Sequence, residues 1–420
     1  MLKKMMVAAA LTAAFVSSAH VAPAQAGGHG KCGIEKGRVN ILGNEFPAIQ
    51  TVVARAKACA VDGLSVESNL TKEHRDLQVA ALTANPAEYT TAIVANGSIV
   101  PLLNAGLIRP LDDLVAKHGA GLNKNQLITV NGKVMAVAFM ANAQHLMVRK
   151  DVLDKAGVAI PTSYEDVIAA AKAIKDKGLM DYPISGTYKS GWNLGEEFVN
   201  MYMGTGASMF KDGTAEIAVN NENGVKALNM LKSMTQYMNP DYLTYDSNAV
   251  QAEFEAGNVA ITNLWGSRAA GILDDEGSTA EITGNTVMAA APTLGGGSTP
   301  ATTLWWDGFS IAINTSDEDA EASFVAMMNG IKPGSLTDDT NKQAVWLIEG
   351  YKPSPVAAGI FGTIKGQAKP YPMLPFGGLL HTAAGDELSD FLQGKETAQQ
   401  ALADIEAAYN TAAKEKGFLK

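Results

Sequence analysis

The sequence predicts an α/β fold with two lobes, each built on a parallel-rich sheet that is covered by helices on both faces. Short apolar runs alternate with segments whose apolar residues recur at helical spacing, which is typical of successive βα units. No repeat or long low-complexity segment interrupts this order. The chain has 420 residues, which exceeds one ordinary domain and therefore favours two lobes.

The first lobe is expected to begin with consecutive βα units. Apolar residues from 39 to 42 predict a strand, and Pro47 is well suited to the first turn of the helix that follows. Ligands of such sheets bind beyond the carboxyl ends of the strands. The expected elements are strands at 39–42, 64–66 and 91–94 and helices at 47–60 and 73–84.

The pattern changes after residue 133. Strand signals at 133–139 and 146–148 flank a polar segment, which predicts a crossing between lobes. Farther on, Ser163 can cap a helix and Asp166 can complete a capping box. The remaining expected elements are a strand at 309–314 and helices at 151–156, 163–178, 224–237, 248–256, 319–329 and 397–414.

Residues 1–26 have the pattern of a secretory signal peptide. Lys3 and Lys4 precede an apolar run that is too short to span a bilayer, and Ala24 and Ala26 form a small-x-small cleavage site. We therefore expect cleavage near Ala26 and a mature protein in the periplasm. A membrane anchor is the alternative interpretation of this segment.

The charge balance restricts the possible partners. The chain has 33 Lys and Arg against 43 Asp and Glu, a formal net charge of −10, and its basic residues form no cluster. Nucleic acids and anionic lipid surfaces require clustered basic residues, so neither is expected as a partner.

The two cysteines predict a structural disulfide. Cys32 precedes the first strand and Cys59 ends the first helix, and these two ends lie on the same side of a βα unit. Oxidising compartments favour such bridges. A metal or redox role lacks support because there is no C-x-x-C motif and the six His are scattered.

Four segments spread over nearly the whole mature chain carry a family resemblance. They are residues 151–172, 254–266, 306–313 and 394–402. In this order they resemble family 1 extracellular solute-binding proteins of ABC importers, including the sugar-binding members. The resemblance implies two lobes that close like a clamp on a ligand in the cleft between them, and docking on ABC transporter permease subunits. We expect a monomer without cofactor or metal, with the first lobe at 27–139 and 309–348 and the second at 140–308 and 349–420.

A sugar site needs aromatic faces for stacking and planar polar groups for the hydroxyls. Trp306 and Trp265 are the first candidates for stacking, although either could be a core residue. Because neighbours on a strand point to opposite faces, at most one of Trp305 and Trp306 should face the ligand. The further candidates are Asp307, Trp192, Asn193 and Arg268 from the second lobe, Asn44, Glu45, Tyr89 and Asn96 from the first, Asn142, Gln144 and His145 from the crossing, and Tyr351 at the edge.

Two other functions remain open at the level of sequence. The same fold could bind a betaine, polyamine or polyol, since aromatic cages attract quaternary ammonium groups. An exported carbohydrate-active enzyme would need two opposed carboxylates, for which Asp307 and Glu45 are conceivable. No G-x-S-x-G, H-E-x-x-H or Walker A motif is present, so the sequence favours carbohydrate binding without catalysis.

Overall fold

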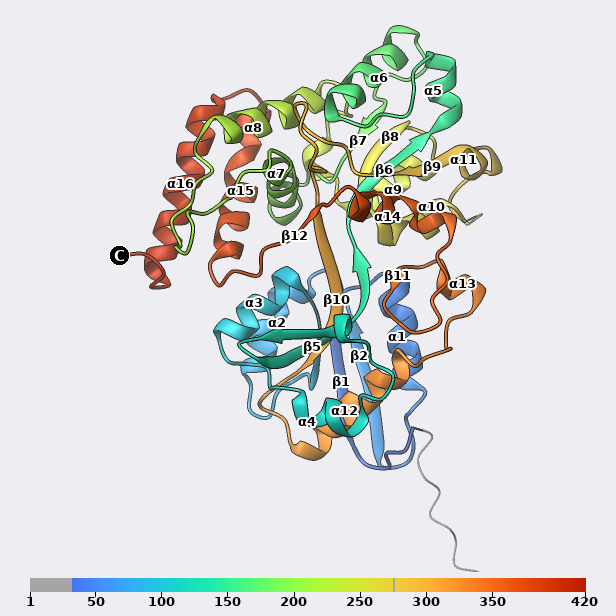
Figure 1. The fold of residues 1–420 in the computed structure, drawn as a ribbon, viewed down its shortest axis with the longest axis vertical. Helices are drawn as coiled ribbons and strands as arrows, with labels where there is room; N and C mark the ends of the chain where they lie inside the picture. The colour runs from blue at the N-terminus through green and yellow to red at the C-terminus, as the bar shows by residue number, and fades with distance from the viewer. Residues whose placement is uncertain (1–31, 275) are drawn as a thin grey trace, which may run out of the picture.

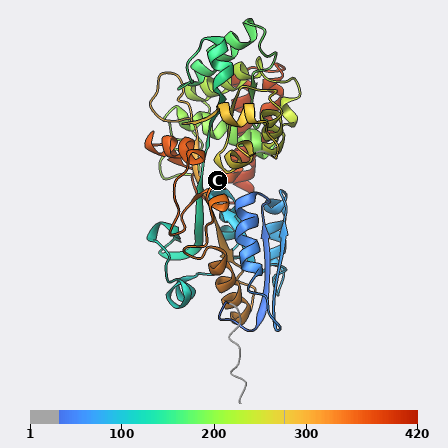
Figure 2. The ribbon, with the colours of Figure 1, turned by 90° about the vertical axis from the view of Figure 1, so that its right-hand side faces the viewer.

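The computed structural model describes residues 32–274 and 276–420 and has the expected two-lobed α/β architecture. Figure 1 and the view turned by 90° in Figure 2 show the two lobes stacked along the long axis. The expected signal peptide lies outside the described residues. Among the residues described, no helix is both long and apolar enough to cross a membrane.

Lobe 1 contains a mixed sheet with the strand order β11-β5-β10-β3-β1-β2. Strands β2 and β3 both pair in parallel with β1, whereas β10 is antiparallel to β3 and β5. Two further strands, β4 and β12, pair with β5 and β10. The strands are β1 (Gly37–Gly43), β2 (Leu64–Leu70), β3 (Thr91–Ala95), β4 (Leu127–Val130), β5 (Lys133–Asn142), β10 (Thr303–Ile311), β11 (Val345–Trp346) and β12 (Lys369–Pro370).

Both faces of this sheet are covered, because successive strand residues point to opposite sides. Ile41 packs in a core with the helices α1 and α12, while its neighbour Leu42 packs in a second core with α2 and α3. Helix α1 begins at Pro47, whose fixed φ suits the first turn. The helices of this lobe are α1 (Pro47–Lys57), α2 (His74–Thr83), α3 (Asn96–Asn104), α4 (Asp112–His118), η1 (Lys124–Gln126), α12 (Asp317–Gly330) and α13 (Asp338–Asn341).

Lobe 2 contains a four-stranded sheet with the order β7-β8-β6-β9. Only β7 and β8 are parallel; β6 is antiparallel to both β8 and β9. The sheets of both lobes are therefore mixed, with more antiparallel than parallel pairs, rather than parallel-rich as expected. The strand β6 enters from the other lobe, so its direction is set by β5 rather than by a βα unit. The strands are β6 (Gln144–Arg149), β7 (Ile184–Ser185), β8 (Ile261–Trp265) and β9 (Thr286–Ala289).

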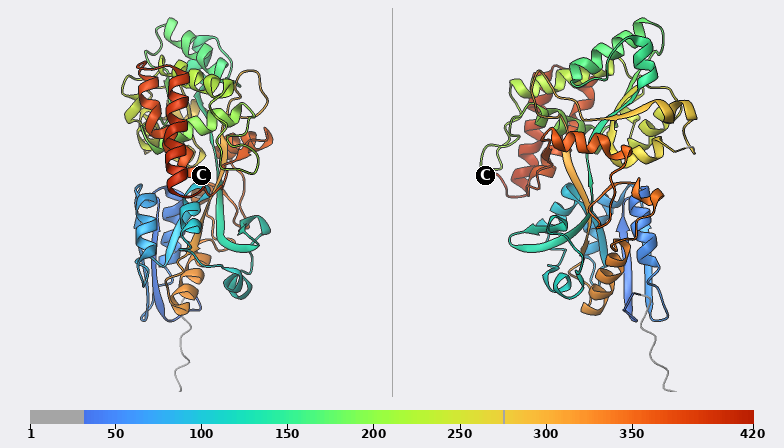
Figure 3. Two further views of the ribbon diagram at one scale, coloured as in Figure 1. Left: turned by 90° about the vertical axis from the view of Figure 1, so that its left-hand side faces the viewer. Right: turned by 45° about the vertical axis from the view of Figure 1, so that its right-hand side comes forward.

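Helices surround the sheet of lobe 2 and form most of that lobe. Figure 3 shows α15 and α16 side by side on its flank, and Tyr409 of α16 is fully buried in the lobe core. Helix α6 starts with the expected capping box, in which Ser163 and Asp166 exchange hydrogen bonds. The helices are α5 (Lys150–Ala156), α6 (Tyr164–Asp176), α7 (Trp192–Gly204), α8 (Glu222–Thr235), η2 (Tyr242–Thr244), α9 (Ser247–Glu255), η3 (Gly266–Arg268), α10 (Ala269–Ile272), α11 (Ala280–Asn285), η4 (Pro355–Ala357), α14 (Ala358–Lys365), α15 (Gly377–Leu392) and α16 (Ala398–Glu415).

Two strands, together with the segment 347–354, carry the chain between the lobes. Ala143 alone separates β5 of lobe 1 from β6 of lobe 2, and β10 runs as one long strand across the junction (Figure 1). The lobe boundaries expected at 139/140 and 308/309 fall inside β5 and β10. Both strands continue past the sheet of lobe 1 because hydrogen bonding between Asn142 and Trp305 extends their ladder to the junction.

The expected disulfide between Cys32 and Cys59 is present, with the two Cα atoms 5.3 Å apart. It joins the chain before β1 to the turn after α1. The bridge closes a loop with a sequence separation of 27 residues. Such a loop restricts the unfolded chain, so the bridge stabilises lobe 1.

Removing this bridge should lower the free energy of unfolding by about 3 kcal/mol on the chain-entropy model. The double variant Cys32→Ser/Cys59→Ser tests this in urea denaturation beside the oxidised protein. The reduced wild-type protein provides the matched control and should unfold at the same urea concentration as the variant. Equal midpoints for oxidised and reduced protein would contradict a stabilising role.

Candidate functional site

A cavity of about 380 Å³ lies between the lobes where β5 and β10 cross. Both lobes contribute to its walls, where polar and charged side chains outnumber the aromatic ones. The lining residues are Asn44, Phe46, Lys72, Glu73, His74, Arg75, Asp76 and Ala95 from lobe 1, Asn142, Trp305 and Asp307 from the crossing strands, and Lys189, Ser190, Trp192, Asn193, Asp246, Ser247, Asn248, Trp265, Ser267 and Arg268 from lobe 2.

Three tryptophans meet in this cavity, and we refer to Trp192, Trp265 and Trp305 as the tryptophan cluster. The ring centroids of Trp192 and Trp265 lie 6.4 Å apart with nearly parallel planes. Trp305 meets both edge-on, at 5.9 Å from Trp192 and 5.8 Å from Trp265. Indole faces of this kind offer flat apolar surfaces to the C–H patches of a ligand.

Strand pairing places two members of the cluster at the junction. Trp305 is opposite Asn142 and Trp265 is opposite Gln144, and these two partners flank Ala143. The end of β8 and the start of the crossing portion of β10 therefore meet beside the inter-lobe connection. Any movement of the lobes about Ala143 would change the separation of the two indoles.

Backbone geometry fixes the third member. Gly191 precedes α7 with a φ of +89°, a conformation that glycine adopts without strain, and this turn directs the chain into the helix at Trp192. The Gly191 N–H donates to the carbonyl of Gly385 in α15 at 3.0 Å. A side chain at Gly385 would approach the Gly191 carbonyl oxygen to 2.2 Å, so α15 must present glycine here.

Two half-buried charged side chains lie beside the tryptophan cluster. The Arg75 guanidinium carbon lies 3.9 Å from the ring centroid of Trp192 and 5.8 Å from that of Trp305. Burial raises the pKa of Asp307 to about 7, although the positive charge of Arg75 opposes this shift. Since Arg75 belongs to lobe 1 and Trp192 to lobe 2, their stacking is a contact across the cavity.

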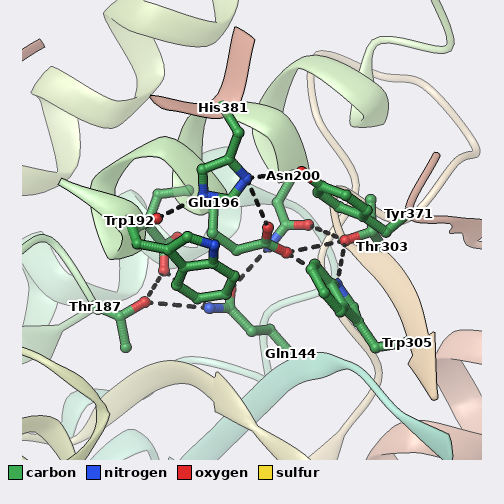
Figure 4. Close-up of polar contacts among 10 residues, drawn as sticks. Gln144, Thr187, Trp192, Glu196, Asn200, Thr303, Trp305, Tyr371 and His381 are labelled. Atoms are coloured by element: carbon green, nitrogen blue, oxygen red, sulfur yellow. Dashed lines mark hydrogen bonds and ion pairs between the residues drawn. The ribbon is translucent and has the colours of Figure 1, made fainter. Parts of the chain in front are cut away.

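A buried polar network supports the cluster from behind (Figure 4). The indole N–H of Trp305 donates to Oε1 of Glu196 at 3.1 Å and to the hydroxyl of Thr303 at 2.8 Å. His381 Nε2 lies 2.8 Å from the backbone carbonyl of Trp192, and its Nδ1 lies 2.9 Å from the Tyr371 hydroxyl. A carbonyl only accepts, so Nε2 carries the proton and the neutral ring accepts from Tyr371 at Nδ1.

Burial controls the ionisation of this network. It raises the pKa of Glu196 to about 8 and that of Glu197 to about 7, and it lowers the pKa of His381 to about 4. Hydrogen bonds from Thr303 and Trp305 partly oppose the shift of Glu196. At neutral pH His381 is therefore uncharged and Glu196 is mostly protonated.

The cavity lining provides stacking faces, hydrogen-bonding groups and charges. In the part of the chain that the structure describes, no three His, Cys, Asp or Glu side chains are grouped so as to hold a metal ion.

Comparison with known proteins identifies the family. The model of the bacterial extracellular solute-binding proteins matches residues 74–332, which is more than half of the chain. The chain belongs to this family.

The similarities to individual solute-binding proteins agree in fold. A probable ABC transporter-binding protein from Deinococcus radiodurans is 29% identical over 196 residues, and the match spans 44% of each chain. The maltose-bound MalE3 of T. maritima superposes with a TM-score of 0.76 at 17% identity, covering 89% of this chain and 99% of that one. A solute-binding protein from Agrobacterium radiobacter in complex with ribitol gives a TM-score of 0.76 at 18% identity, covering 90% and 99%.

The cavity of this solute-binding protein contains half of the residues expected from its sequence. They come from the end of β1, the crossing strands, and the loops of lobe 2. The residues that the structure brings together are Asn44, Asn142, Trp192, Asn193, Trp265, Arg268 and Asp307. Ligand contact by any of them stays a prediction.

Trp306 and Trp305 point to opposite faces of β10, as strand alternation requires, but the cavity lining includes Trp305 and not Trp306. Trp306 packs against the α2–α3 side of lobe 1. Its backbone N–H donates to Oδ1 of Asn96 at 2.9 Å. The Asn96 side chain therefore helps to hold β10 in lobe 1. The family pattern favours Trp306 as a stacking residue, but Trp306 does not line the cavity.

The remaining expected residues lie outside the cavity lining for separate reasons. Tyr89 is buried in lobe 1 and accepts a hydrogen bond from Asn69 at 3.1 Å. Gln144 belongs to the buried network, where it donates to Thr187 and Glu197. His145 is fully buried under α14, Tyr351 is half-buried at the edge of the lobe 1 core, and Glu45 is exposed.

Sequence reasoning missed the segment after β2, which contributes Lys72, His74, Arg75 and Asp76 to the cavity. The expected residues Asn44 and Asn96 follow β1 and β3, and Arg75 lies beyond the end of β2, which runs parallel to both strands. The rule that ligands bind beyond the carboxyl ends of parallel strands would have found Arg75. The buried network had no sequence signal, because Glu196 and Glu197 resemble any exposed acidic pair on a helix.

Proposed function

We propose that this protein captures a carbohydrate, either a sugar or a sugar alcohol, in the cavity between its lobes and delivers it to the permease of an ABC importer. The tryptophan cluster carries this proposal. It places three indoles beside amide, guanidinium and carboxylate groups in one inter-lobe cavity. Stacking faces combined with planar hydrogen-bonding groups suit a polyhydroxylated ligand.

The solved structures of similar fold support the same class of ligand. Their bound molecules include maltose, ribitol and D-mannitol. Their identity to this chain is 20% or lower, so the individual ligand does not follow from them. The basic and apolar start of the sequence supports export to the periplasm, with cleavage near Ala26.

We propose hinge closure about Ala143 as the mechanism. A ligand that contacts both lobes favours the closed state only to the extent that it binds that state more tightly. The stacking of Arg75 on Trp192 is a contact that forms when the lobes approach. The closed form would then dock on the permease.

The alternatives fit the cavity less well. A quaternary ammonium or polyamine would have to bind on the indole faces. The positively charged guanidinium of Arg75 already lies over Trp192, so it would repel such a cation there. For a glycosidase, Asp307 lines the cavity but Glu45 does not, so the imagined carboxylate pair is not assembled there.

A thermal-shift screen of neutral sugars, acidic sugars, sugar alcohols, betaines and polyamines tests the proposed function. A carbohydrate that binds only the native state should raise the melting temperature. At a ligand concentration one hundred times Kd, it should stabilise the folded state by about 2.7 kcal/mol. The same ligand should reduce the radius of gyration in small-angle X-ray scattering. Stabilisation by a betaine or polyamine alone, with no carbohydrate effect, would overturn the proposal.

A further inference from the structure

The charged side chains inside the cavity differ in how they are paired. Apart from the exposed side chains at its rim, the half-buried charged groups that line it are Arg75, Arg268, Asp246 and Asp307. Two of these are cations and two are carboxyl groups. The two acidic residues Asp246 and Glu73 already have partners, since Asp246 caps α9 and faces Lys189 at 3.6 Å, and Glu73 accepts from Thr71.

The two guanidinium groups have unused donors. Within residues 32–274 and 276–420, neither Arg75 nor Arg268 makes a side-chain hydrogen bond, and neither has a carboxylate oxygen within 4.0 Å. Stacking on Trp192 uses the face of the Arg75 guanidinium. Its N–H groups lie in the plane of the guanidinium and stay available at the edge.

Closing the lobes on a neutral ligand would leave Arg75 without a full counter-charge. Removing a cation from water is costly unless an opposite charge replaces the lost hydration. Asp246 faces Lys189 and caps α9, and Asp307 is the carboxyl group that acts most strongly on Arg75. Burial raises the pKa of Asp307 to about 7, so it is partly neutral at physiological pH. Arg75 therefore lacks a full counter-charge in the closed cavity.

We propose that the ligand is a sugar or polyol derivative that carries one oxyanion, a carboxylate or a sulfonate, and that Arg75 binds this group. The inference rests on the proposed function and specifies its substrate class. The planar fork of a guanidinium matches the two oxygens of such an anion and can bind both at once. Trp192 holds the fork in orientation, while Trp265 and Trp305 remain for the sugar ring.

The first experiment probes the anion site without a sugar. Wild-type protein and the Arg75→Gln variant are melted in sodium acetate, in sodium methanesulfonate and in sodium chloride of equal ionic strength. The matched control is Arg109→Gln, which removes an arginine that pairs with Asp317 outside the cavity lining. Acetate or methanesulfonate should raise the melting temperature of the wild type and of the Arg109 variant, but not of the Arg75 variant, relative to chloride.

The second experiment measures specificity by calorimetry with matched pairs of ligands: glucose with glucuronate, galactose with galacturonate, glucitol with gluconate, and glucose with glucose 6-sulfonate. In at least one pair the anionic member should bind about 10- to 100-fold more tightly, as expected for hydrogen bonds to a charged group. In Arg75→Gln that ratio should fall to about one, and Arg75→Lys should recover part of it.

The outcomes separate the two proposals. Equal salt responses in wild type and Arg75→Gln, or neutral members that bind as tightly as their anionic partners in every pair that binds, would overturn the anion site while leaving carbohydrate capture intact. If no sugar or polyol bound but the acetate or methanesulfonate response depended on Arg75, the anion site would stand and the carbohydrate proposal would fall. The circular dichroism spectrum checks that each variant is folded.

Discussion

Replacing Trp265 with Ala should reduce the affinity for the bound carbohydrate by about 30- to 1000-fold, the loss typical of a tryptophan at the centre of a binding site. Trp265 is half-buried, lines the cavity and lies 5.8 Å from Trp305. The variant loses a stacking face and the packing that keeps water out. Calorimetry with the carbohydrate found in the thermal screen measures the change.

Trp306→Ala is the matched control for this experiment. The two tryptophans are both half-buried, but Trp306 packs on lobe 1 away from the cavity. Its replacement should change the affinity less than threefold, although both variants should lose a similar amount of thermal stability. A larger loss of affinity for Trp306→Ala than for Trp265→Ala would show that the ligand binds elsewhere.

The free energy of unfolding of the ligand-free protein should fall as the pH rises from about 6.5 to about 8. Burial raises the pKa of Glu196 to about 8, and of Glu197 and Asp307 to about 7, above their values in the unfolded chain. The folded state then holds protons that the unfolded state has released. The stability that these groups contribute is complete below their unfolded pKa and is lost as the pH rises through the folded pKa.

Histidines produce the opposite slope at lower pH. Burial lowers the pKa of His74 to about 3 and those of His145 and His381 to about 4. Their contribution is complete above the unfolded value of 6.5 and is lost as the pH falls. Between about pH 4.5 and 6.5 the two sets oppose each other, so maximal stability is expected there.

The variant Glu196→Gln isolates one of these groups. Glutamine still accepts from Trp305 and Thr303 but does not titrate, so its stability relative to wild type should rise by about 1.4 kcal/mol per pH unit between pH 5 and 8. Urea denaturation across this range measures the difference. The exposed Glu415→Gln serves as the control and should follow the wild-type curve. Parallel curves for Glu196→Gln and wild type would mean that Glu196 is ionised in the folded protein.

Local signals predicted the elements of this fold well. The helix expected from Pro47 ends at Lys57, and the capping box at Ser163 forms as expected, because both depend on residues adjacent in sequence. The direction of β6 was not predictable in this way. It depends on which lobe the preceding strand comes from, which no local pattern records.

The cavity lining includes the expected residues Asn44 after β1 and Asn142 at the end of β5. Several expected residues whose position depends on strand faces or on buried partners lie outside it. Alternation showed that Trp305 and Trp306 must diverge, but not which face looks into the cavity. Below the junction, the side of β10 that carries Phe309 packs against α1 and α12. At Trp305 the same side has left the sheet of lobe 1 and faces the other lobe. That change depends on where the sheet ends, which is a property of the whole fold.

The position of the tryptophan cluster also makes the protein an optical reporter of its own cavity. Three of its five tryptophans lie there with ring centroids no more than 6.4 Å apart, and both Arg75 and His381 stack on Trp192. Indole emission responds to the polarity of its surroundings and to charged groups near the ring. A ligand that displaces water or shifts Arg75 would therefore change the intrinsic fluorescence, so unlabelled protein can be followed in stopped-flow mixing as the lobes close.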